Sequence, residues 1–193
     1  MRLQPRPLFE VEGDYEIFAS MEVVRFITNG ATVDYTKVPL DADGNRIIKK
    51  GTPMAKITAS GKYRPYTGGL ALTANVAANA TTAVLNDVSR LVVGDIVTFY
   101  NGTNTEPKTI TAINTGTKTI SFTAITNAYT TANGVLTMAD GGDTPTFITV
   151  RPVNIKDGDH VIGGVEVAKL ISARLAVTVD AALKAKMPGI TFA

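Results

Sequence analysis

The strongest constraint on the fold lies between Leu70 and Gly142, where charged residues almost disappear and short strand-like runs alternate with turn signals. β-Branched and aromatic residues fill the runs, and Gly, Asn and Asp fill the segments between them. Short strands at this spacing are typical of a small barrel or sandwich. We therefore predict strands at 81–85, 96–100, 108–113, 119–123 and 135–138.

Paired glycines flank this block, Gly68-Gly69 before it and Gly141-Gly142 after it. Because glycine relaxes the backbone, we interpret the pairs as hinges. We predict that residues 70–142 form an inserted small β domain, whose two ends lie close together in a parent domain. The parent, or core, domain is then discontinuous and consists of residues 15–69 and 143–193. One alternative stays open, a continuous meander without a second core.

The core domain is predicted around a compact hairpin from Thr52 to Tyr66. Gly61 supplies its turn, because glycine adopts φ > 0 without steric cost. An earlier strand is expected from Tyr15 to Thr28. Asn29-Gly30 is a strong hairpin signal and predicts a return strand from Thr32 to Val38. The residues of the first strand expected to pack in the core are Val23, Val24, Phe26 and Ile27.

Beyond the block, strands are expected at 146–150 and 190–192, and the run 165–175 is ambiguous between strand and helix. One helix is predicted from Thr178 to Met187, with Thr178 or Asp180 as its cap. Helix-type periodicity is otherwise scarce. The sequence therefore indicates a mostly β protein.

Two residue types that often carry enzyme chemistry, cysteine and histidine, are absent or occur only once in the sequence. There is no cysteine, and the single histidine, His160, has no second histidine or thiol to pair with. Ser60 lacks the first glycine of a nucleophile elbow. The segment Asp41 to Asn45 has its glycine in the fourth place, where a calcium loop needs it in the sixth, and is interpreted as a turn. We therefore predict no catalytic, cofactor-binding or metal-binding residue and no enzyme activity.

Charge and hydropathy narrow the partners further. The chain has 19 basic and 17 acidic residues and a net charge of +2, without the clustered basic excess typical of nucleic-acid binding. No apolar run approaches the ~20 residues of a membrane-spanning helix. The first residues lack the apolar stretch of a signal peptide. We expect synthesis in a cytoplasm, and neither a nucleic acid nor a membrane as partner.

Residues 1–14 are predicted to form an extended arm. Pro5 and Pro7 prevent a helix there, and fourteen extended residues reach ~45 Å, far enough to contact a neighbouring molecule. A frayed terminus is the alternative. The arm carries the apolar residues that we expect to bind such a neighbour, namely Leu3, Leu8, Phe9 and Val11.

Three segments outside the 70–142 block carry a resemblance to a known family. They are the hairpin Ala55 to Tyr63, the strand and turn Val153 to His160, and the terminal helix followed by Gly189 to Phe192. Together they resemble the phage head decoration proteins of the lambda D-like family. The resemblance implies a small, mostly β fold that trimerises at the three-fold positions of an expanded capsid, to whose surface an N-terminal arm adds. The long block 70–142 departs from the family, which usually has a short connection there.

The resemblance implies a structural virion protein on the outer capsid surface, made in the host cytoplasm, which cements the shell as a homotrimer. Its partner would be the major capsid protein, and residues 1–14 would be the capsid-binding arm. The alternative is a binding module for glycans or a host surface, carried by residues 70–142 and mounted on the capsid through the core domain.

Overall fold

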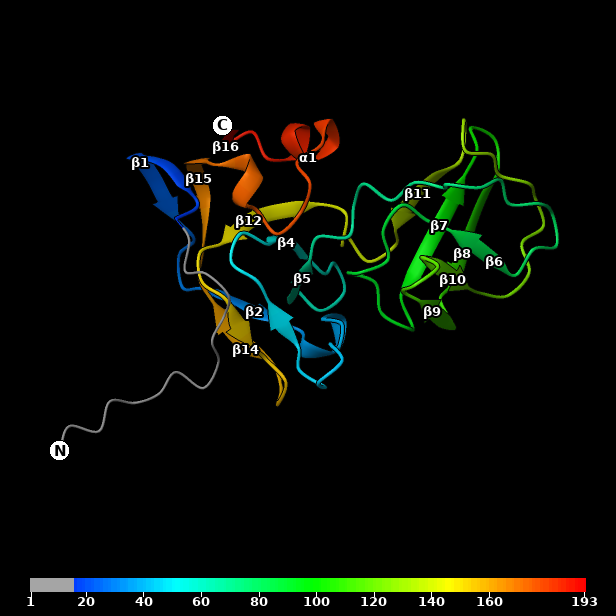
Figure 1. Cartoon of the computed structure of the whole chain (residues 1–193), viewed down its shortest axis with the longest axis horizontal. Helices are drawn as coiled ribbons and strands as arrows, with labels where there is room; N and C mark the ends of the chain where they lie inside the picture. The colour runs from blue at the N-terminus through cyan, green and yellow to red at the C-terminus, as the bar shows by residue number, and fades with distance from the viewer. Residues whose placement is uncertain (1–15) are drawn as a thin grey trace.

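The computed structural model describes residues 16–193 and shows a mostly β protein with one short α-helix (Figure 1). The four apolar residues predicted to bind the capsid, Leu3, Leu8, Phe9 and Val11, lie outside the described residues, as does the arm that carries them. Among the described residues, no helix is long and apolar enough to cross a membrane.

An eight-stranded sheet, built from residues on both sides of the 70–142 segment, curls into a half-barrel (Figure 1). Residues 160–170 run antiparallel to residues 33–18, so β14 and β15 pair in turn with β2 and β1. Both segments bend between their two strands, and this bend lets the sheet curl back on itself. The strands are β1 (Phe18–Phe26), β2 (Ala31–Val33), β4 (Pro53–Lys56), β5 (Tyr63–Pro65), β12 (Pro145–Thr149), β14 (His160–Ile162), β15 (Gly164–Leu170) and β16 (Ile190–Phe192).

The predicted central hairpin is confirmed. Strands β4 and β5 pair antiparallel, with Ala55 opposite Arg64, and Gly61 in the turn has φ of +71°. A side chain at this φ would be strained, so the local glycine preference fixes the turn. The predicted turn at Asp41 to Asn45 is also present, and the Asp41 carboxylate accepts hydrogen bonds from the Asp43 and Asn45 amides.

The hairpin predicted at Asn29-Gly30 is wrong. Both residues have positive φ, 62° and 71°, as a tight turn requires. However, β1 and β2 pair with 160–170 instead of with each other, so the turn forms a corner of the sheet. The return strand predicted from Thr32 to Val38 ends at Val33, because Asp34 caps the 3-10 helix η1 (Tyr35–Lys37).

The C-terminal predictions hold in outline. The ambiguous run is strand β15, followed by the 3-10 helix η2 (Ser172–Arg174). Helix α1 (Ala181–Lys186) is shorter than predicted, because the Asp180 carboxylate caps it by accepting a hydrogen bond from the Leu183 amide at 2.7 Å. The final strand β16 pairs parallel with β15. A separate pair joins β3 (Ile47–Ile48) and β13 (Val153–Asn154).

The 70–142 segment forms two three-stranded sheets, ordered β6-β10-β9 and β11-β7-β8. The predicted strands at 96–100 and 135–138 are confirmed, whereas the single strand predicted at 108–113 is broken. Ile110 leaves the ladder because its backbone pairs with the turn at Gly94 and Asp95. The strands are β6 (Thr82–Val84), β7 (Ile96–Tyr100), β8 (Thr105–Thr109), β9 (Ala112–Asn114), β10 (Thr119–Ser121) and β11 (Val135–Met138).

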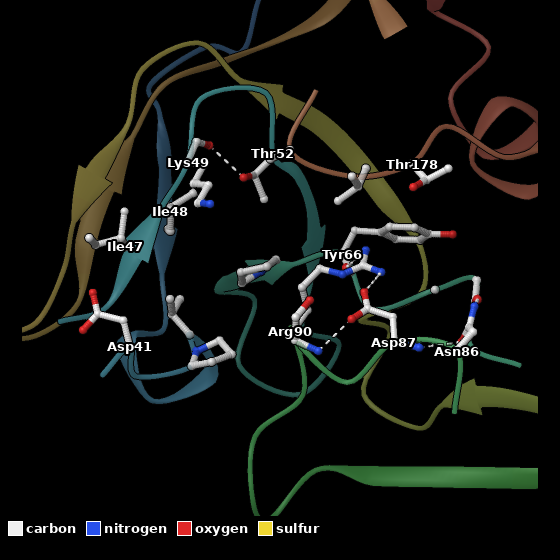
Figure 2. A pocket seen from close by; sticks show the side chains of 18 of the residues that line it. Asp41, Ile47, Ile48, Lys49, Thr52, Tyr66, Asn86, Asp87, Arg90 and Thr178 are labelled. Atoms are coloured by element: carbon white, nitrogen blue, oxygen red, sulfur yellow. Dashed lines mark hydrogen bonds and ion pairs between the residues drawn. The ribbon is translucent and has the colours of Figure 1, made fainter. Parts of the chain in front are cut away.

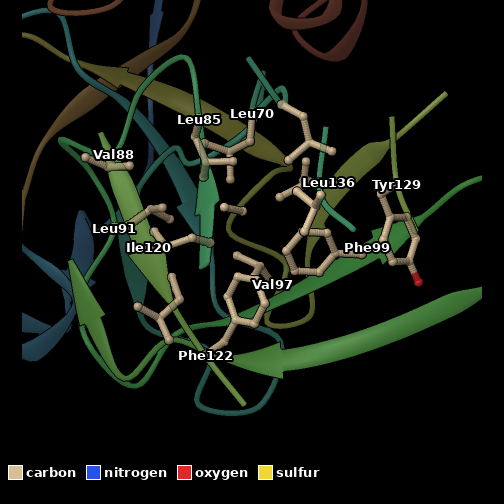
Figure 3. Packing of buried hydrophobic residues seen from close by; sticks show 14 of the residues in the cluster. Leu70, Leu85, Val88, Leu91, Val97, Phe99, Ile120, Phe122, Tyr129 and Leu136 are labelled. Atoms are coloured by element: carbon tan, nitrogen blue, oxygen red, sulfur yellow. The ribbon is translucent and has the colours of Figure 1, made fainter. Parts of the chain in front are cut away.

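The buried apolar residues fall into three clusters. One contains only residues between 70 and 138, and Figure 3 shows its side chains from both small sheets pointing toward one another. Phe99 packs against Phe122 and Tyr129 with ring centroids 5.2 and 5.3 Å apart. The other two clusters lie within 17–66 and 147–190. The 70–142 segment thus encloses apolar packing of its own, and its boundaries as a domain stay a prediction.

Candidate functional site

A buried cluster of charges joins the 70–142 segment to the curled sheet. Arg64 on β5 and Asp95 before β7 are both fully buried. The Arg64 guanidinium donates to both Asp95 carboxylate oxygens, at 2.8 and 2.6 Å, and to Asp140 Oδ2 at 2.7 Å. A buried charge is tolerated only when it is paired and hydrogen-bonded. We call Lys37, Arg64, Asp95 and Asp140 the ionic joint.

Lys37 and the backbone complete the ionic joint. Lys37 Nζ donates to Asp95 Oδ1 at 2.8 Å, and the Val92 amide donates to Asp95 Oδ2 at 3.0 Å. Burial opposes the charge of Asp95, but hydrogen bonding and attraction to Arg64, helped by Lys37, outweigh it and lower the pKa of Asp95. Burial likewise opposes the charge of Arg64, and the two carboxylates reverse that effect and raise its pKa. Both groups are therefore held ionised.

The glycines on either side of the segment lie in tight packing around the ionic joint. A Cβ added to Gly142 would lie 2.6 Å from Thr67 Oγ1, and one added to Gly68 would lie 2.3 Å from the Tyr66 hydroxyl. The Thr67 amide also donates to the Gly142 carbonyl at 2.7 Å. The positions where the sequence suggested hinges are thus a close-packed junction between two parts of the chain.

A cleft of about 680 Å³ opens beside the ionic joint (Figure 2). On its wall, Arg90 donates to the Tyr66 carbonyl at 2.7 Å and to Asp87 at 2.9 Å, and its guanidinium lies 5.7 Å from the centroid of the Tyr66 ring. The charges of Arg90 and Asp87 therefore pair with each other. The residues that line the cleft include no histidine or cysteine.

Three neighbouring side chains at the floor of this region have a buried polar atom without a hydrogen-bond partner among residues 16–193. They are Arg64 at Nε, Tyr66 at its hydroxyl and Thr67 at Oγ1. Burial, reinforced by the nearby Asp180 charge, raises the pKa of Tyr66. Unsatisfied buried groups cost stability, so close packing at the junction outweighs hydrogen bonding there.

A second cluster of polar contacts pins a loop of the 70–142 segment. The Glu106 carboxylate on β8 accepts hydrogen bonds from the Thr126 and Asn127 amides, each at 2.8 Å, and from the Tyr129 hydroxyl at 3.1 Å. Burial opposes its charge, but these bonds outweigh it and lower the pKa of Glu106 to about 2. The arrangement fixes the loop before β11 and keeps Glu106 ionised near neutral pH.

An exposed apolar strand is the remaining candidate. Met21, Val23 and Phe26 on β1 are 65%, 66% and 53% exposed, although the sequence predicted Val23 and Phe26 to be packed. The prediction failed because apolar side chains at strand spacing indicate a buried face without saying what buries it. Large apolar side chains left exposed along one strand are candidates for an interaction site. We call these three residues the β1 patch.

The residues singled out in the sequence do not assemble into a reactive site. His160 is exposed on β14, where it faces solvent. No group of three His, Asp or Glu side chains in the described part of the chain could hold a metal ion. The ionic joint was missed, although a signal existed. Asp95 and Asp140 are two of the few charges in a segment nearly free of charge, and such isolated carboxylates require buried partners or solvent.

Comparisons of this chain with protein-family models, with curated proteins and with solved structures found no match. Its function must therefore be argued from the geometry. That geometry consists of a close-packed junction between two parts of the chain, a cleft beside it, and a strand with exposed apolar side chains.

Proposed function

We propose that this chain is a structural virion protein, a phage head decoration protein of the lambda D-like kind. It binds the outer surface of an expanded capsid as a homotrimer at three-fold positions and stabilises the shell against rupture. The observation that supports this proposal is the arrangement of the three segments that carry the resemblance. The β4–β5 hairpin, the β13–β14 connection and the α1–β16 end all lie outside the 70–142 segment, around the half-barrel.

The mechanism is a clamp. The arm of each copy, residues 1–14, pairs as an extra strand with the backbone of the major capsid protein, and Leu3, Leu8, Phe9 and Val11 fill apolar pockets on its surface. Ordering an arm costs ~1–2 kcal/mol per residue, which the new contacts must exceed. Three linked copies bind together with an avidity that a single weak contact cannot reach.

In this proposal the ionic joint makes the folded body of the clamp rigid. Shell stabilisation requires that force on one contact is carried to the others without local unfolding. The buried pairs of Arg64 with Asp95 and Asp140 tie the 70–142 segment to the half-barrel through hydrogen bonds of 2.6–2.8 Å. In this proposal the segment is an inserted domain that projects from the capsid surface and is held in a fixed orientation.

Deletion of residues 1–14 tests the clamp. We expect the truncated protein to keep its circular dichroism spectrum and to lose at least tenfold in affinity for expanded capsids, measured by co-sedimentation. A control with Leu3, Leu8, Phe9 and Val11 changed together to Ser keeps the arm's length and removes its apolar contacts, and we expect a similar loss. Unchanged affinity of the truncated protein would refute the clamp.

A second candidate function is a displayed binding module for a glycan or a host surface. One observation favours it: Tyr100 on β7 stands opposite Val135 on β11, and both side chains are exposed. An exposed ring beside an apolar group suits the apolar face of a sugar. A glycan array separates the two ideas, since binding that is lost in Tyr100→Ala would support the module and an array without hits would remove it.

A further inference from the structure

We infer that the β1 patch is a second shell-binding surface, which docks onto an apolar surface of the major capsid protein next to the arm's own contact. This inference rests on the proposed function, because it takes the shell as the arm's partner. It adds a surface of the folded body to an interaction so far assigned only to residues 1–14.

The edge of the sheet at β1 is open. Among the described residues β1 pairs only with β15, and its other edge carries no strand. Such edges are normally protected by charges, bulges or covering loops, because an open edge can pair with another chain. An open edge beside large apolar side chains is therefore either a binding surface or a site of aggregation. The geometry of β1 distinguishes these two possibilities.

A large bulge between Ser20 and Arg25 shapes the strand. Ser20 stands opposite Lys169 and Arg25 opposite Val167, so five steps along β1 correspond to two along β15. The extra residues leave the ladder and hold Met21 and Val23 away from the protein's own core, which accounts for their exposure. The same bulge interrupts regular strand pairing, so β1 is a poor template for uncontrolled aggregation. It presents side chains, and the partner must receive them in apolar pockets.

The charges on β1 define the partner further. Arg25 pairs with Glu166 on the neighbouring strand at 2.7 Å and is thereby neutralised. Glu22, between Met21 and Val23, is exposed, and its carboxylate has no ion-pair partner among residues 16–193. The complementary surface therefore offers apolar pockets with a basic side chain opposite Glu22.

Continuity with the arm favours the shell over a second copy of this chain. The arm ends at Asp14 and β1 begins at Phe18, so a shell-bound arm holds the start of β1 within ~13 Å of the shell at about 3.3 Å per residue. In Figure 1, β1 lies beside β16 and the C-terminus, at the end of the molecule away from the 70–142 segment. The outward-projecting segment and the β1 patch are thus at opposite ends, as a surface-mounted protein requires.

The test is a triple variant, Met21→Ser, Val23→Ser and Phe26→Ser. These side chains are mostly exposed, so we expect the fold and the thermal midpoint to be kept. Val161→Ser on β14 is the matched control, since Val161 is 59% exposed at the other edge of the same sheet. Affinity for expanded capsids is measured by co-sedimentation and solution mass by light scattering. We expect the triple variant to bind at least tenfold more weakly at unchanged solution mass, and the control to match wild type.

The other outcomes overturn the inference in distinguishable ways. If the triple variant binds capsids like wild type while deletion of residues 1–14 abolishes binding, the arm clamp stands and the β1 patch is no shell contact. If the triple variant's solution mass falls, a second copy covers the patch and the inference is wrong. If the wild-type protein itself does not bind capsids, the proposed function fails, and the inference fails with it.

Glu22 supplies an independent check. Reversal of its charge in Glu22→Lys should weaken capsid binding at low salt more than the neutral Glu22→Gln does, and the difference should shrink at high salt. Equal binding of both variants and wild type at low salt would contradict the basic side chain assigned to the partner.

Discussion

The buried pair of Arg64 and Asp95 makes the sharpest prediction, because the change needed to test it is a single side chain. Arg64→Met keeps a long apolar stem at the position and removes four hydrogen bonds, two to Asp95, one to Asp140 and one to the Arg90 carbonyl. Asp95 then stays buried and charged, with Lys37 as its only remaining cation in contact. Removal of one partner from a buried pair costs about 3–5 kcal/mol.

Since Lys37 remains, we expect the lower end of that range, about 3 kcal/mol in the free energy of unfolding. For a chain of this size each kcal/mol shifts the thermal midpoint by about 2–4 °C, so the midpoint should fall by about 6–12 °C. The assay is unfolding followed by circular dichroism, by heat and by urea, with limited proteolysis to locate newly accessible sites. We expect new cleavage near residues 68–69 and 141–142.

Arg25→Met is the matched control. The Arg25–Glu166 pair has a similar distance, 2.7 Å, but its side chains are 68% and 38% exposed. Exposed pairs contribute about 0–1 kcal/mol, so this variant should stay within about 2–4 °C of wild type. Equal midpoints for Arg64→Met and Arg25→Met would refute the reasoning, because burial would then make no difference to what the pair contributes.

Three further predictions follow from the packing and the ionisation states. The pKa of Glu106 is lowered to about 2 in the folded protein, so its contribution to stability is complete above its ordinary pKa near 4.5 and is lost as the pH falls toward 2. The thermal midpoints at pH 6 and pH 3 should therefore differ less in Glu106→Gln than in wild type, and an identical difference in both proteins would contradict this. Tyr66→Phe removes a buried hydroxyl without a hydrogen-bond partner among the described residues, so the urea midpoint should stay the same or rise, and a loss above about 1 kcal/mol would reveal a missed partner. Gly142→Ala places a Cβ 2.6 Å from Thr67 Oγ1 and should lower the free energy of unfolding by about 1–3 kcal/mol in the same urea assay. Gly116→Ala, whose added Cβ has its nearest contact at 3.5 Å, should be nearly neutral, and equal urea midpoints for the two variants would contradict the close packing.

Local features of the fold could be predicted from the sequence. The β4–β5 hairpin follows from its turn, because only a residue tolerant of positive φ fits at Gly61. Strands β7 and β11 begin and end where the flanking turn residues indicate, and the Asp180 cap is a preference of the residue itself. Each of these depends on neighbours within a few positions.

Long-range features could not be predicted. The Asn29-Gly30 turn has the backbone that a hairpin needs, but residues 160–170, far along the chain, determine that it is a corner. Nothing in the neighbouring sequence marks Arg64 as buried, and its partners Asp95 and Asp140 lie 31 and 76 residues away. The exposure of Val23 accompanies the irregular register between Ser20 and Arg25 in β1, which no local pattern encodes.

The rupture temperature of expanded, empty capsids, with and without saturating amounts of this protein, tests the central claim most directly. The capsids would be assembled from the major capsid protein encoded in the same genome and their rupture followed by light scattering. The account predicts that the protein raises the rupture temperature and that deletion of residues 1–14 abolishes the rise. Capsids that rupture at the same temperature in the presence and absence of the full-length protein would contradict it.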